Sequence, residues 1–180
     1  IAEIAHRYGI PLIVDSTMTT PYQCRAIDFG ADIILHSATK YLGGHGTSMA
    51  GIVVDSGRFP FAGNPRFPQY NNPDESYHGI VFAKDCGNSG FITRLRALVL
   101  RDIGACLSPF NAFLIMLGVE TLSLRMDKHS QNTKAVAEYL EGHPQVAKVN
   151  CPMLASSPYH QRMKKYMPKG CGSVFTFELK

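Results

Sequence analysis

The sequence predicts an α/β fold with a mainly parallel central sheet. Two apolar runs, "IPLIVD" at 10–15 and "DIILHS" at 32–37, have the length and the near-continuous apolar character of buried strands. The segment between them is long enough to form a crossover, which parallel pairing requires. From residue 91 onward, helical patterns dominate the chain.

Local patterns predict the elements of the first half in order. Ile1, Ile4 and Ala5 recur at helical spacing, and Gly9 ends this first helix. The segment 16–31 is expected to be a loop that contains one short helix. A third strand is predicted within "SMAGIVVDSG", where an Asp-Ser-Gly turn ends it.

The segment from Arg58 to about Gly90 has no regular pattern. It contains six aromatic residues, four prolines and the sequence "NNPDESYHG". Long loops inside a compact domain usually have a function, so we expect a functional role for this one.

Helices are predicted to follow this segment. An amphipathic helix covers 91–105, and a second begins within 108–122, with Ser108 as N-cap and Pro109 at the first helical position. A long helix covers 120–143, and Pro144 directly after it ends the helix. A short strand, a helix and a final strand complete the chain, at 146–149, 159–166 and 172–180.

Composition excludes several classes of protein. The 180 residues are 45% hydrophobic and 18% charged, enough for one core or for one core and part of another. The net charge of +4 comes from scattered basic residues, so we expect neither a nucleic acid nor a membrane as partner. The five cysteines are odd in number and show no C-x-x-C, and we interpret them as reduced thiols of a cytoplasmic protein.

Both ends of the sequence look interrupted. It opens without Met inside a helical pattern, and it stops within the strand pattern "GSVFTFELK". We therefore expect a piece of a longer polypeptide.

Polar residues follow the first two predicted strands. Asp15 ends the first strand, and Ser37, Thr39 and Lys40 follow the second. Ligands of open α/β sheets bind at the carboxyl ends of parallel strands, so we expect all four residues at one rim. This set suits pyridoxal phosphate (PLP), which needs a lysine for its Schiff base, an acid for its pyridine nitrogen and donors for its phosphate.

Each of these residues also has a simpler interpretation when it is taken alone. Asp15 precedes a serine and a threonine and could be a helix cap or turn former. Lys40 could be a solvated surface lysine, and Ser37 and Thr39 could bind the local backbone. The combination is far more specific than any single member.

Other sites are not supported by the motifs. The glycine-rich turn at 43–46 is not a P-loop, because the lysine precedes the glycines. It also does not match G-x-G-x-x-G, because Met49 stands in place of the last glycine. The histidines show no H-E-x-x-H, so no metal site is expected, and we expect His36 and His45 to be hydrogen-bonding loop residues. The absence of G-x-S-x-G argues against a serine hydrolase.

Three segments resemble a known family. "VDST" at 14–17 and "HSATKYLGGHG" at 36–46 resemble motifs of the Cys/Met-metabolism family of PLP-dependent enzymes, and "LSPFNAFLIMLGVETLSLRM" at 107–126 resembles its interdomain helix region. Within the family, the aromatic segment with "YHG" at 77–79 is similar to that of O-acetylhomoserine sulfhydrylases.

The resemblance implies an aspartate-aminotransferase-like fold (PLP fold type I). It places residues 1–125 in the C-terminal part of the PLP-binding large domain. Residues 126–180 would form the interdomain helix and the beginning of a smaller α+β C-terminal domain.

The resemblance also implies roles for individual residues. It assigns to Lys40 the aldimine with PLP and the proton shuttle of catalysis. Asp15 would pair with the pyridine nitrogen, Ser37 and Thr39 would bind the phosphate, and Thr17 would support Asp15 or the ring. The family's phosphate-binding glycine turn and ring-stacking aromatic would precede residue 1, and its substrate-carboxylate arginine would follow residue 180.

The implied reaction is a γ-replacement of methionine biosynthesis, in which O-acetyl-L-homoserine and sulfide give L-homocysteine and acetate. A γ-lyase or γ-synthase acting on methionine or cystathionine is an open alternative, and so is a catalytically silent, partner-binding homologue. The expected partners are small-molecule substrates and further copies of the chain, in a dimer of dimers.

Overall fold

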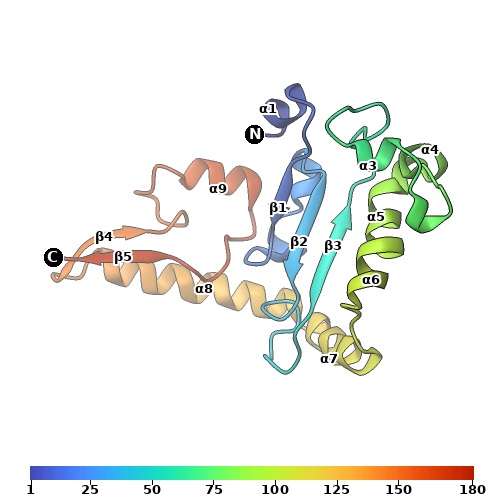
Figure 1. Ribbon diagram of the computed structural model, residues 1–180. Helices are drawn as coiled ribbons and strands as arrows, with labels where there is room; N and C mark the ends of the chain where they lie inside the picture. The colour runs from blue at the N-terminus through green and yellow to red at the C-terminus, as the bar shows by residue number, and fades with distance from the viewer. The chain divides into compact units, whose positions relative to one another are not determined.

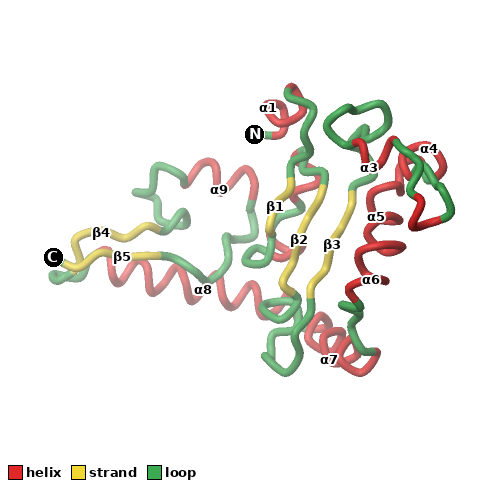
Figure 2. The backbone as a smooth tube through the Cα atoms, viewed as in Figure 1, coloured by secondary structure: helices red, strands yellow, loops and turns green.

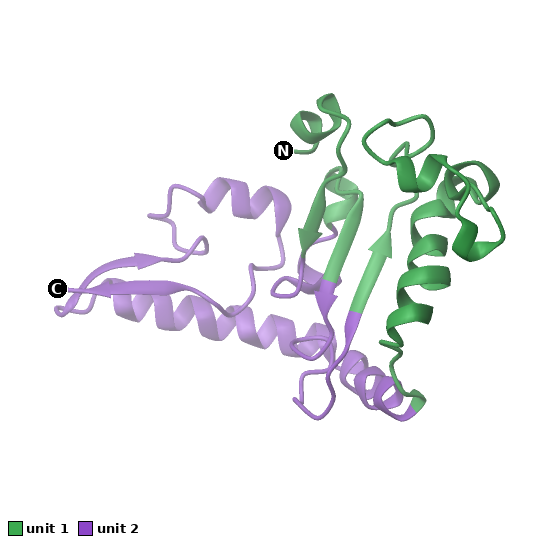
Figure 3. Ribbon diagram, in the orientation of Figure 1, with its two compact units in different colours: residues 1–15, 26–35, 52–109 green, residues 16–25, 36–51, 110–180 purple.

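The computed structural model describes all 180 residues as two compact units. Figure 3 colours them separately. The first unit comprises residues 1–15, 26–35 and 52–109, and the second comprises residues 16–25, 36–51 and 110–180. No helix of the chain is both long and apolar enough to cross a membrane.

The main sheet has three strands in the order β1-β2-β3. Their bounds are Ile13–Asp15, Ile33–Ser37 and Gly51–Asp55. β1 and β2 pair in parallel, with Ile13 opposite Ile33 and Asp15 opposite Leu35, which confirms the predicted parallel pairing. The arrow of β3 points in the direction opposite to those of β1 and β2, so β3 is antiparallel to them (Figure 1).

Burial differs between the two parallel strands. Ile33 and Ile34 of β2 are buried, whereas Ile13 of β1 is 52% exposed. The prediction of a buried strand at 10–15 is therefore wrong in two respects, since β1 is shorter and is not buried. A strand is buried only where other elements cover its faces, and the exposure of Ile13 shows that its face of β1 is largely uncovered.

The first unit contains short helices and one longer helical segment. The bounds of α1, α3 and α4 are Ala2–Arg7, Pro68–Asn71 and Phe82–Asp85. The predicted helix at 91–105 is confirmed as a continuous run of α5 (Gly90–Arg94), a π-helical stretch (Leu95–Leu100) and α6 (Arg101–Ile103). Gly104, with φ of 71°, ends it in the left-handed conformation that favours glycine.

The core of the first unit is aromatic. Phe59, Phe61, Tyr70 and Phe82 are buried together, and Phe67 and Phe91 pack against them. The ring centroids of Phe59 and Phe61 lie 4.8 Å apart in an edge-to-face arrangement. The irregular segment after Arg58 is therefore a packed core rather than an open loop.

The second unit is mainly helical. Its helices α2, α7, α8 and α9 have the bounds Thr20–Gln23, Pro109–Glu120, Leu122–Glu141 and His160–Tyr166. The predicted helix start at Pro109 is confirmed. β4 (Val146–Asn150) and β5 (Thr176–Leu179) form an antiparallel ribbon beside α8 (Figures 1 and 2).

Two small cores hold the second unit together. One contains Ala38, Leu42, Ile115, Leu122 and Met126, and it packs α7 and the start of α8 against the segment after β2. The other contains Ala137, Cys151 and Leu154. The expected domain boundary between residues 125 and 126 falls inside α8 and stays a prediction.

Candidate active site

Lys40 lies in a tight turn directly after β2. We define residues 36–46 as the lysine turn. The Lys40 N–H donates to the Ser37 carbonyl at 3.1 Å, the Gly43 N–H to the Ala38 carbonyl at 2.9 Å, and the Gly44 N–H to the Lys40 carbonyl at 2.8 Å. Three backbone hydrogen bonds therefore fix the main chain on both sides of the lysine.

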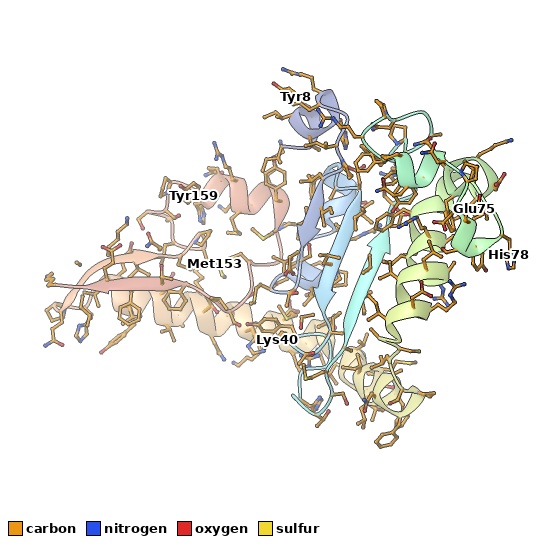
Figure 4. The ribbon with its side chains drawn as sticks, viewed as in Figure 1. Tyr8, Lys40, Glu75, His78, Met153 and Tyr159 are labelled. Carbon is orange, nitrogen blue, oxygen red and sulfur yellow. The ribbon has the colours of Figure 1, made fainter.

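A pocket of about 430 Å³ opens beside this turn. Lys40, Thr39 and Tyr41 line it together with Arg125 and His129 of α8. No carboxylate lines the pocket. The Lys40 side chain, which is labelled in Figure 4, lies at the surface. It forms no hydrogen bond or ion pair within the chain, so its amine is available to a ligand.

Ser37 is held by Thr17. The Ser37 N–H donates to the Thr17 hydroxyl at 2.8 Å, and the Thr17 side chain is buried. The Ser37 hydroxyl has no partner within the chain, so it is free to bind a ligand. The structure thus brings together two of the predicted site residues and gives Thr17 a positioning contact.

Thr39 binds the backbone at Ala50. Its hydroxyl accepts the Ala50 N–H at 2.9 Å and lies 3.4 Å from the Ala50 carbonyl. The second distance is long for an O–H···O hydrogen bond, so the hydroxyl hydrogen can turn toward a stronger acceptor. Thr39 is compatible with phosphate binding, but it also performs the local backbone role that a threonine often has.

Asp15 lies in the first unit, at the carboxyl end of β1. Its register partner in β2 is Leu35, and its side chain is exposed. Its pairing with a pyridine nitrogen stays a prediction.

The segment after Asp15 contains a strained residue. Thr20 has a φ of 57° and is fully buried. A β-branched residue rarely adopts this conformation, which costs of order 1–3 kcal/mol. The Thr20 N–H donates to the Ser16 carbonyl at 2.9 Å, and the Tyr22 N–H donates to the Thr20 hydroxyl at 3.3 Å. These contacts hold the strained turn that carries Thr17.

Both histidines of the lysine turn bind backbone carbonyls. His36 Nδ1 donates to the Ser16 carbonyl at 3.1 Å, and His45 Nδ1 donates to the Gly43 carbonyl at 2.7 Å. A carbonyl only accepts, so each ring carries a hydrogen on Nδ1. The prediction of hydrogen-bonding loop residues is confirmed for His45, whereas His36 forms its hydrogen bond from within strand β2 rather than from a loop.

Arg125 is a pocket residue that the sequence did not single out. Its guanidinium donates to the backbone carbonyls of Tyr41, Leu42 and Gly118. Partial burial lowers the pKa of Arg125 from its ordinary value. The arginine stands within a segment that resembled the family, but nothing in its spacing indicated which carbonyls it would reach.

Comparison with known proteins decides the family. Residues 1–180, the whole chain, match the family described as Cys/Met metabolism PLP-dependent enzymes. The chain belongs to this family. The aspartate-aminotransferase-like fold that the resemblance implied is thereby confirmed, together with PLP as the family's cofactor.

Two curated relatives of the family cover the chain from end to end. The homocysteine/cysteine synthase of Saccharomyces cerevisiae is 47% identical over all of this chain and 41% of its own length. The O-acetyl-L-homoserine sulfhydrylase of Leptospira meyeri is 44% identical over all of this chain and 42% of its own length. The chain thus spans about two fifths of the length of the curated relatives it matches.

A solved structure of the family has the same fold. It is a Campylobacter jejuni protein described as an O-acetylhomoserine (thiol)-lyase, 38% identical, with a TM-score of 0.90 over 99% of this chain and 45% of that one. That protein contains N'-pyridoxyl-lysine-5'-monophosphate, a lysine joined to the cofactor.

The residues of this chain fit PLP. The cofactor needs an amine that can reach its carbonyl carbon and donors for its phosphate. The Lys40 amine has no competing partner at an open pocket, and the Ser37 hydroxyl is likewise unbonded. No residue that lines the pocket carries a carboxylate that would repel a phosphate, and Asp15, the acid predicted for the pyridine nitrogen, is not among the lining residues.

Proposed function

We propose that the intact protein catalyses γ-replacement on O-acetyl-L-homoserine with sulfide, giving L-homocysteine and acetate. The observation that carries the proposal is the unpaired Lys40 amine at an open pocket, in a chain that belongs to a family of PLP-dependent enzymes. Support for the substrate comes from the relatives named homocysteine/cysteine synthase and O-acetyl-L-homoserine sulfhydrylase.

Lys40 has two roles in this proposal. Its amine binds the cofactor covalently, and once the substrate amine has displaced it, the same amine removes the proton from the substrate's α-carbon as a general base. The backbone hydrogen bonds on both sides of Lys40 keep the amine at the pocket during both roles.

Asp15 holds the cofactor's pyridine nitrogen in its protonated form. A carboxylate beside a pyridinium stabilises the positive charge, and the pyridinium in turn keeps the carboxyl ionised. When bound, the cofactor supplies an electron sink for the carbanion formed at the substrate's α-carbon.

Ser37 and Thr39 bind the phosphate through their hydroxyls. Thr17 acts on this site indirectly, because its hydroxyl accepts the Ser37 N–H at 2.8 Å and fixes the start of the turn. We further propose the domain division at residues 125 and 126, a dimer of dimers, and a cytoplasmic location for the intact protein.

Two other functions make different predictions for the same assay. A γ-lyase would release a 2-oxo acid and ammonia without sulfide. A catalytically silent homologue would bind a partner and would not need a reactive amine at residue 40.

The test uses the intact protein loaded with PLP and supplied with O-acetyl-L-homoserine. Equal amounts of homocysteine and acetate in the presence of sulfide support the proposal. Release of 2-oxobutanoate at the same rate with and without sulfide would establish γ-elimination instead.

Borohydride reduction followed by peptide mapping identifies the lysine. The pyridoxyl label is expected on Lys40, and Lys40→Ala should lose it while Lys84→Ala, an exposed control in α4, retains it. A label on another lysine would overturn the assignment of Lys40.

A further inference from the structure

Arg125 holds the lysine turn against two helices. Nη1 donates to the Tyr41 carbonyl at 2.8 Å, and Nη2 donates to the carbonyls of Leu42 at 3.3 Å and Gly118 at 2.7 Å. Nε donates to the Thr121 hydroxyl at 3.2 Å. One side chain of α8 thus connects the two residues after Lys40 to the end of α7.

The partners of this guanidinium are unusual because none of them is charged. Arginine usually pairs with a carboxylate or a phosphate, whose geometry its planar fork matches. No salt bridge of Arg125 is present in the chain. The fork is used here to hold main-chain carbonyls of two segments, one 84 and the other 7 residues before Arg125 in the chain.

Glycines allow this close approach. A Cβ atom on Gly44 would lie 2.6 Å from the Arg125 guanidinium, and one on Gly43 would lie 2.9 Å from Ile115 Cδ1. A Cβ atom on Gly118 of α7 would overlap the Gly43 carbonyl oxygen. The turn therefore lies between α7 and the guanidinium, and there is no room for a side chain at Gly43 or Gly44.

Arg125 lines the same pocket as Lys40, but its donors are largely engaged. A guanidinium has five N–H donors, and four hydrogen bonds to the chain are formed by Arg125. Little capacity is left to bind a ligand directly. Its geometry suits holding the backbone rather than recognising an anion.

We propose that Arg125 is a positioning residue for Lys40. By fixing the carbonyls of the two residues that follow the lysine, it sets the direction in which the amine enters the pocket. The proposal rests on the proposed role of Lys40 in holding the cofactor and adds a residue to it that touches neither cofactor nor substrate.

The test compares Arg125→Lys with a matched control in the intact, PLP-loaded protein. Lysine keeps the charge but cannot reach three carbonyls with a planar fork. The control is Arg162→Lys, because Arg162 is an exposed residue of α9 without a hydrogen bond or ion pair in the chain. For each protein we would measure the rate of cofactor release, the visible circular dichroism of the bound cofactor, kcat, KM and Tm.

In Arg125→Lys we expect release to be about tenfold faster, as for a lost set of charge-assisted hydrogen bonds. The visible dichroism should change, and kcat should fall on the order of 100-fold because the reacting amine is misplaced. KM should change much less, and Arg162→Lys should resemble the wild type in every measurement.

A purely structural arginine would behave differently. If Arg125→Lys lowers Tm but leaves release, dichroism and kcat of the folded protein unchanged, the proposal is wrong, and it is equally wrong if nothing changes. If this variant does not fold, Thr121→Val removes the Nε partner of Arg125, together with the 3.4 Å hydrogen bond from the Thr121 hydroxyl to the Gly118 carbonyl. Faster release in Thr121→Val then supports the proposal, and wild-type release overturns it.

A separate measurement distinguishes failure of the proposed function from failure of the role proposed for Arg125. Borohydride trapping in the wild type reports whether Lys40 holds the cofactor at all, before any Arg125 variant is compared.

Discussion

The lysine turn and the aromatic segment, which we define as residues 58–91, are stabilised in opposite ways. The lysine turn is held by hydrogen bonds to backbone carbonyls, and it contains glycines where neighbours leave no space. The aromatic segment has little regular structure and is held by rings that pack edge to face and by stacking, as with Phe61 and Phe91.

This difference separates two requirements on the chain. A reactive amine must have a defined direction, and hydrogen bonds and tight backbone contacts give direction at the cost of tolerance to added atoms. Apolar burial is nondirectional, so it gives stability without defining the position of any reacting atom. Substitutions in the two regions should therefore affect different measurements.

The largest effect on stability is expected from Phe82→Ala. Phe82 is fully buried in the aromatic core, and removing such a ring costs about 3–5 kcal/mol. Thermal unfolding of the intact protein should show a large decrease in Tm, while the folded fraction keeps wild-type cofactor release. Tyr139→Ala, at a position that is 68% exposed in α8, is the control. A change in cofactor release with unchanged Tm in Phe82→Ala would contradict the separation of the two regions.

Asp15→Asn should lower turnover with little change in Tm, the reverse of the effect expected for Phe82→Ala. The substitution keeps the size of the side chain, so Tm should change little. Turnover should fall about 100-fold if the pyridine nitrogen loses about two units of pKa, since each unit corresponds to about 1.4 kcal/mol. Steady-state kinetics measure this loss, and Glu75→Gln, at an exposed acid of the aromatic segment, controls for loss of charge. Near-normal turnover would show that Asp15 is only a turn residue.

Gly118→Ala should affect both stability and the site. Alanine favours helices over glycine by about 1 kcal/mol, but its Cβ atom would overlap the Gly43 carbonyl oxygen. Overpacking of this kind costs about 1–3 kcal/mol, and relief requires movement of the lysine turn. We expect a lower Tm together with faster cofactor release. Gly51→Ala, where no atom lies within 4 Å of the added carbon, should release cofactor like the wild type.

Local patterns were sufficient to predict the elements that carry the site. The parallel pairing of the first two strands, the position of Lys40 after β2 and the helix start at Pro109 all follow from residues close together in the chain. His36 and His45 were predicted to form hydrogen bonds because metal-ligand spacing was missing, and both do so, although their carbonyl partners were not predicted. These features depend on hydrogen bonds and conformations that a few neighbouring residues determine.

Contacts between distant segments could not be predicted in the same way. The reach of Arg125 to Tyr41 joins residues 84 positions apart, and the overlap at Gly118 exists only because α7 crosses the lysine turn. An irregular segment such as the aromatic one gave no periodicity that would indicate a core, because its rings come from turns and short helices. Packing in three dimensions determined all three features.

The smallest effect is expected at alkaline pH. Burial, together with the neighbouring Cys151, raises the pKa of the Cys171 thiol in the second unit from 9.0 to about 11. In the aromatic core, burial raises the pKa of Tyr70 above its ordinary value of 10.0. Both groups therefore stay neutral in the folded protein at pH values where the unfolded chain has begun to lose their protons.

In both regions, deprotonation at alkaline pH lowers the stability of the folded state. The folded pKa of Cys171 is raised, so its stabilising contribution is complete below pH 9.0 and is lost as the pH rises toward about 11. Tyr70 contributes in the same direction only above pH 10.0. Tm of the intact protein should therefore fall less between pH 8.5 and 9.5 in Cys171→Ala than in the wild type, whereas Tyr70→Phe should show the wild-type decrease over this interval. Equal decreases in all three proteins would mean that the Cys171 thiol is solvated in the folded state.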